Sequence, residues 1–83
     1  MVHVKVFATL IDIVGSRTIE INGPRTVREL IDALDSKYPG FKKELERGFL
    51  ILVNGSNITE KQGLNTEIEE DDTVSIFPPV GGG

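Results

Sequence analysis

The sequence contains no cysteine. A disulfide framework, a zinc site built on thiolates and a thiol nucleophile are therefore excluded. Because small secreted domains usually depend on such cross-links, we expect a cytoplasmic protein. Long apolar runs are also missing. Residues 1–6 do not resemble a signal peptide, and no stretch approaches the roughly 20 apolar residues of a membrane span, so no membrane partner is expected.

Basic residues are outnumbered, with nine Lys and Arg against 13 Asp and Glu and a net charge of −4. A nucleic-acid-binding protein needs a basic surface to displace counterions from phosphates, so no nucleic acid partner is expected. Acidic residues gather over 67–72. A solvated turn is the simpler interpretation of that run, and attraction of a basic partner is the alternative.

Groups that could carry catalysis are scarce. His3 is the only histidine and falls on the outward face of a predicted strand, where a surface role is expected. Ser16 has no triad partners, because there is no second histidine to activate a serine. The glycines match no phosphate-binding loop, and the acidic run lacks the ligand spacing of a calcium loop. We predict no metal site, no bound cofactor and no active site within the fold.

The first part of the chain predicts a pair of strands. Apolar residues alternate with others over 2–8, which predicts a strand whose even-numbered residues, through Ala8, face the core. A loop over 12–16 leads to a second, short strand over 18–21. The two strands are expected to pair as a hairpin.

A helix is predicted to begin after Thr26. Thr26 and Glu29 have the spacing of a capping box, in which each side chain bonds a free backbone N–H. Pro39-Gly40 ends the helix, and a further helical turn is predicted over 41–47. The apolar stripe of the main helix follows the spacing i, i+3, i+4 and i+7 and consists of Val27, Leu30, Ile31 and Leu34.

The second half of the chain predicts further strands. An uninterrupted apolar run over 49–53 indicates an interior strand. Asn54-Gly55 is typical of a two-residue hairpin that leads into a short strand over 57–59. A loop begins at Gly63, and renewed alternation predicts the last strand over 73–77.

This order of elements predicts a single domain of the α+β class with the β-grasp topology. We expect a mixed sheet of four to five strands with one main helix packed across it, and with the first and last strands parallel and adjacent. Phe7 and Phe77 occupy outward positions on those strands, so their rings should meet on the exposed face. Single exposed apolar residues are common, but two large rings together indicate a docking surface, which residues near Leu64 are expected to extend.

Residues 78–83 are predicted to form an extended tail beyond a domain of residues 1–77. Pro78-Pro79 cannot donate ladder hydrogen bonds and favours an extended conformation that projects the residues after it. Gly81 to Gly83 leave the terminal carboxylate unhindered, so it can enter a narrow channel and be adenylated. A frayed end is the alternative interpretation.

These motifs resemble the MoaD/ThiS sulfur-carrier family of ubiquitin-like proteins. Gly63-Leu64-Asn65-Thr66 is similar to the archaeal MoaD-like group, some of whose members also act as small protein modifiers. The turn before the last strand departs from the family's common Asp-Gly-Asp pattern, because Asp71 stands where Gly is usual. Asp tolerates the left-handed conformation, so the departure is a small one. The most specific motif is the Phe-Pro-Pro-Val-x-Gly-Gly ending, which points to the MoaD branch. In order, the motifs are Val4-Lys5-Val6-Phe7-Ala8, Thr26-Val27-Arg28-Glu29-Leu30, Lys37-Tyr38-Pro39-Gly40, Val53-Asn54-Gly55 and the ending Phe77-Pro78-Pro79-Val80-Gly81-Gly82-Gly83.

The resemblance implies a carrier subunit whose catalytic groups belong to its partners. Gly82 and Gly83 would supply the reactive end, which a ubiquitin-activating-type (MoeB-like) enzyme would adenylate with ATP before sulfur transfer gives a thiocarboxylate. A MoaE-like large subunit of molybdopterin synthase would accept the tail and use its sulfur to build the dithiolene of a molybdenum or tungsten pterin cofactor. The residues expected to contact partners are Phe7, Phe77, Leu64, Pro78, Pro79, Val80 and Gly81.

Two other functions stay open from the sequence. A protein modifier would use the same activation and end in an isopeptide bond between Gly83 and a lysine. A plain interaction module would carry an inert tail.

Overall fold

The computed structural model describes residues 1–78, and the predicted tail positions 79–83 lie outside the described residues. No helix within residues 1–78 combines the length and the apolar character needed to cross a membrane. The elements are β1 (Val2–Val6), α1 (Thr9–Val14), β2 (Thr18–Ile21), α2 (Val27–Lys37), α3 (Phe41–Leu45), β3 (Leu50–Val53), β4 (Ser56–Asn57), the short 3-10 helices η1 (Ile58–Glu60) and η2 (Gly63–Asn65), and β5 (Thr73–Phe77).

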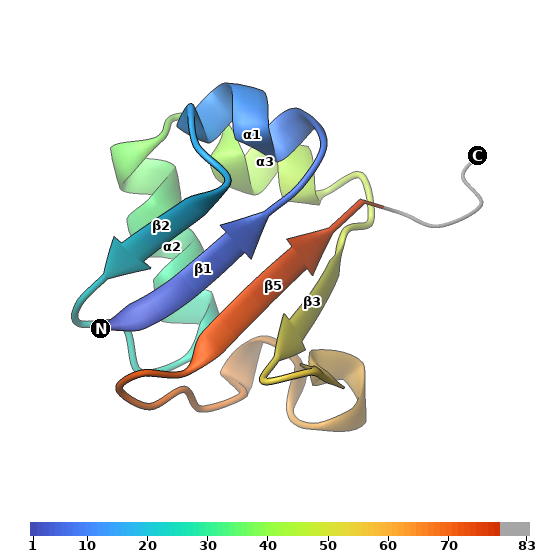
Figure 1. Cartoon of the computed structure of the whole chain (residues 1–83). Coiled ribbons are helices and arrows are strands. Elements are labelled where there is room, and N and C mark those ends of the chain that lie inside the picture. The colour runs from blue at the N-terminus through green and yellow to red at the C-terminus, as the bar shows by residue number, and fades with distance from the viewer. Residues whose placement is uncertain (79–83) are drawn as a thin grey trace.

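The strands form one mixed sheet in the order β2-β1-β5-β3-β4. β1 and β5 are parallel, while the other neighbours are antiparallel. Helix α2 lies behind one face of the sheet, α1 and α3 lie beyond the upper end of β1, and the face toward the viewer is open (Figure 1). The predicted α+β class and β-grasp topology, including the adjacent first and last strands, are confirmed.

The core fills the space between the sheet and α2. Val4 pairs with Val74 and Val6 with Ile76 across the central strands, and these side chains are buried on the helix side. The predicted apolar stripe of α2 is buried against them, and Phe41 of α3 is fully buried. Each such side chain contributes roughly 1.5–3 kcal/mol through removal of apolar surface from water.

The segment after β1 differs from the sequence expectation. β1 ends at Val6, and Ala8 is exposed in a positive-φ conformation with φ 57° and ψ −131°. That turn directs the chain into α1, where Leu10 takes the buried place predicted for Ala8. The predicted loop over 12–16 is therefore wrong for its first three residues. A helix of only six residues is held by packing rather than by propensity, so its sequence signal is weak.

The cap at the start of α2 makes one of the two predicted hydrogen bonds, and its other hydrogen bond goes to a different residue. Thr26 Oγ1 accepts a hydrogen bond from the Glu29 backbone N–H at 3.1 Å. Glu29 Oε1 accepts from the backbone N–H of Arg25 at 2.9 Å, instead of from Thr26 itself. Glu29 thus holds Arg25, the residue before Thr26, while Thr26 holds the first turn of the helix.

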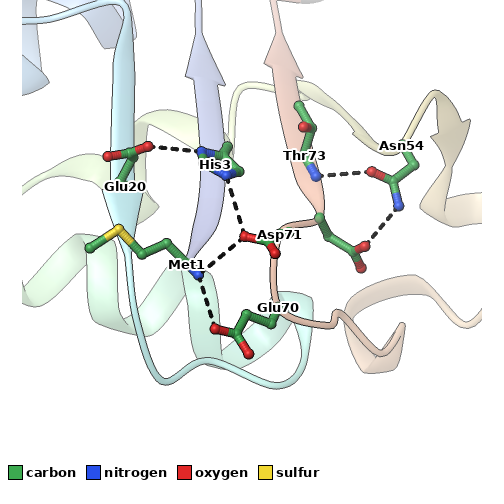
Figure 2. A network of polar contacts seen from close by, with 8 residues as sticks. Met1, His3, Glu20, Asn54, Glu70, Asp71 and Thr73 are labelled. Atoms are coloured by element: carbon green, nitrogen blue, oxygen red, sulfur yellow. Dashed lines mark hydrogen bonds and ion pairs between the residues drawn. The ribbon is translucent and has the colours of Figure 1, made fainter.

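The predicted hairpin at Asn54-Gly55 is present. Both residues have positive φ, 49° and 88°, as a type I′ turn requires. β4 occupies 56–57 rather than 57–59, because the chain enters η1 at Ile58 and buries that side chain. Asn54 also binds the start of β5: its Oδ1 accepts from the Thr73 N–H at 2.9 Å (Figure 2).

Candidate functional site

Phe7 and Phe77 form a stacked pair on the open face of the sheet. Phe7 follows Val6, which pairs with Ile76, so the register sets Phe7 beside Phe77. The ring centroids are 4.4 Å apart and the ring planes differ by 14°. Both side chains are half-buried, so part of each ring contacts solvent. The expectation that the two rings meet on the exposed face is confirmed.

Two leucines of β3 extend this pair, and the sequence analysis missed them. Leu50 pairs with Phe77, and Leu52 lies two residues further along the same face. Leu50 is 37% exposed, which makes it one of the most exposed large apolar side chains among residues 1–78. The uninterrupted apolar run over 49–53 could have indicated these leucines, because a strand with one open face usually carries polar residues on that face. We call Phe7, Phe77, Leu50 and Leu52 the apolar face.

Leu64 does not belong to the apolar face, so that part of the expectation is wrong. It lies in η2 and lines a surface hollow together with Ile31 of α2 and Leu45 of α3. Ile51, whose side chain points to the helix side of the sheet, lines the same hollow. The path of the chain between β4 and β5 carries Leu64 to the helix side.

The opposite end of the open face is polar and charged (Figure 2). His3 Nδ1 lies 3.0 Å from Glu20 Oε2, and His3 Nε2 lies 3.8 Å from Asp71 Oδ1. The Met1 ammonium lies 3.7 Å from Glu70 and 3.6 Å from Asp71. Asp71 has φ 69°, the left-handed conformation expected where the family usually has Gly. The environment of His3 is that of a surface residue between carboxylates.

Residues 1–78 contain no group of three or more His, Cys, Asp or Glu side chains arranged to hold a metal ion.

The tail leaves the domain directly beside the apolar face. β5 ends at Phe77, as the two prolines predict, and Pro78 is half-buried. Five residues follow Pro78, and an extended chain of that length reaches about 17 Å. A partner seated on Phe77 is thus within reach of Gly83. The predicted positions Pro79, Val80, Gly81, Gly82 and Gly83 lie outside the described residues, and their roles stay predictions.

Known proteins are similar to this chain in both sequence and fold. Small archaeal modifier protein 3 of Haloferax volcanii is 32% identical, over 98% of this chain and 97% of that protein. The molybdopterin synthase sulfur carrier subunit of Emericella nidulans is 31% identical, over 93% of this chain and 91% of its own. A chain in the crystal structure of the Amycolatopsis orientalis BexX/CysO complex superposes with a TM-score of 0.88 at 30% identity, with all of both chains covered.

The model of one protein family, described as the ThiS family, matches residues 4–83, which include the apolar-face residues and the whole tail. The extent of that match and the β-grasp fold lead to one assignment: this chain is a member of the ThiS family.

Proposed function

We propose that this protein is a sulfur carrier, the small subunit of a molybdopterin synthase, and that its sulfur is held as a thiocarboxylate at Gly83. The observation that carries the proposal is the family match through residue 83 together with an apolar face at the root of the tail. Similarity to a molybdopterin synthase sulfur carrier subunit supports the assignment to the molybdenum or tungsten cofactor.

The proposed chemistry takes place at the Gly83 carboxylate. A carboxylate oxygen attacks the α-phosphorus of ATP on an activating enzyme and displaces pyrophosphate, which leaves an acyl-adenylate. A donor at the oxidation level of sulfide then attacks the acyl carbon and displaces AMP. The carbon loses one C–O bond and gains one C–S bond, so no oxidant is consumed. Glycine suits this position because it puts no side chain beside the acyl carbon.

The apolar face would hold the domain while the tail enters the partner. A MoeB-like activating enzyme and a MoaE-like large subunit would each cover Phe7, Phe77 and Leu50 in turn. Burial of partly exposed aromatic and leucine side chains provides binding energy, and large aromatic residues are frequent at the centres of interfaces. Because both partners would use one face, their binding is mutually exclusive.

Protein modification is the second candidate function. It is supported by the similarity to small archaeal modifier protein 3. Here the same acyl-adenylate, or a thioester formed from it, would be attacked by a lysine ε-amine, which gives an isopeptide bond with loss of AMP or a thiol.

Reconstitution tests the proposal. The protein, the activating enzyme encoded in the same genome and ATP are combined, and pyrophosphate release is measured. Release that disappears when Gly82 and Gly83 are deleted is expected, while unfolding of the shortened protein should be unchanged. Equal pyrophosphate release with the full-length and the shortened protein would mean that the tail is inert and that the protein is a plain interaction module.

A further inference from the structure

Lys5 is the one charged side chain among the described residues in the half of the open face that adjoins the tail. It lies on β1 between Thr18 of β2 and Ser75 of β5. Leu52 is next in the same row, opposite Ser75. The row toward the tail consists of Phe7, Phe77 and Leu50. Lys5 is exposed and projects from the same side of β1 as Phe7.

No ion pair within residues 1–78 involves Lys5. Its strand neighbours Thr18 and Ser75 carry hydroxyl groups without charge. The carboxylate of Glu20, which is on the same face, contacts His3 at 3.0 Å instead. The Lys5 side chain is thus exposed to solvent with no charged partner among residues 1–78.

A partner that covers the apolar face also covers the Lys5 side chain, because Lys5 shares a row with Leu52 and lies next to the row of Phe7, Phe77 and Leu50. Removing an ammonium from water without a counter-charge is strongly unfavourable, whereas a hydrogen-bonded carboxylate compensates for the lost hydration. We propose that Lys5 is a specificity-determining residue, which selects a large subunit that presents an Asp or Glu carboxylate beside its apolar contact residues. This inference rests on the proposed function.

The charged end of the sheet fixes how such a partner is placed. His3 lies two residues before Lys5 on β1, about 7 Å away along the strand. Glu20 and Asp71 flank His3 there (Figure 2). A partner carboxylate shifted by one row would face these two carboxylates and be repelled. Lys5 and the acidic end together therefore favour a single register, in which the tail points into the partner.

Binding of the cognate large subunit, measured by calorimetry with the full chain at low and high salt, tests the proposal. Lys5→Glu should weaken binding more than tenfold, as expected when a charge pair at an interface becomes a like-charge contact, and should weaken the salt dependence. Lys43→Glu is the matched control, since Lys43 is exposed on α3, on the other side of the sheet. Lys5→Gln shows whether loss of charge alone weakens binding.

Restored binding of the Lys5→Glu protein by one Asp→Lys or Glu→Lys change in the large subunit would support the pairing. Two results would overturn it: Lys5→Glu binding within about twofold of the parent, or no restoration by any reversal on the subunit's docking surface. If Phe77→Ala also binds normally, the docking face itself is wrong. Pyrophosphate release that depends on Gly83 would still establish activation, so the proposed function and the role of Lys5 fail separately.

Discussion

Phe7 stacks on Phe77 with 4.4 Å between ring centroids, although 70 positions separate them in the sequence. Parallel pairing of β1 and β5 makes this contact, and it connects the first strand to the residue from which the tail begins. The contact therefore serves the fold and also builds the apolar face beside Pro78, where the predicted tail begins.

Phe77→Ala should separate these two roles. Loss of the stacked pair is expected to lower the free energy of unfolding by about 1 kcal/mol beyond the lost burial. Binding of a partner at the apolar face should weaken by more than about tenfold. Leu64→Ala is the control, because Leu64 is a 39% exposed apolar side chain that lies in the hollow on the helix side. Urea unfolding and titration calorimetry measure both effects. Equal loss of binding in the two variants would contradict the assignment of the docking face.

Ala8→Gly should stabilise the protein. Ala8 has φ 57° and ψ −131°, which an L-residue seldom adopts. Relief of about 1–3 kcal/mol of strain exceeds the roughly 0.5–1 kcal/mol entropic cost of glycine, so the free energy of unfolding should rise by about 1 kcal/mol. The same change at Ala33, inside α2, should lower it by about 1 kcal/mol. Urea unfolding that shows a loss at both positions would mean that Ala8 is not strained.

Thr26→Ala should destabilise the protein through its longest helix. The Thr26 hydroxyl accepts the Glu29 N–H, and its removal leaves that donor without its cap. The expected loss is about 1 kcal/mol in the free energy of unfolding. Thr26→Ser keeps the oxygen and should retain most of the stability. A Ser variant as unstable as the Ala variant would assign the effect to the lost methyl group instead of the cap.

Local patterns in the sequence predict α2, the strands and the Asn54-Gly55 hairpin, because spacing, caps and turn residues act over a few positions. The Phe7–Phe77 contact follows once the topology is known, since the parallel register of β1 and β5 places Phe7 next to Phe77. Helix α1 does not follow from its sequence, because its position depends on the positive φ of Ala8 and on burial of Leu10. Leu64 was assigned to the wrong side, because nothing in the spacing determines the path of the chain between β4 and β5.

The intact mass of the protein purified from its native cells tests the central claim most directly. A sulfur carrier should show a species that is heavier by the difference between one sulfur and one oxygen atom, with the change confined to the C-terminal peptide that ends at Gly83. That species should disappear when the activating enzyme is deleted. An unmodified Gly83 carboxylate under conditions in which the cofactor is being made, with the C-terminal peptide of this protein joined through Gly83 to lysines of other proteins, would contradict sulfur transfer and establish protein modification instead.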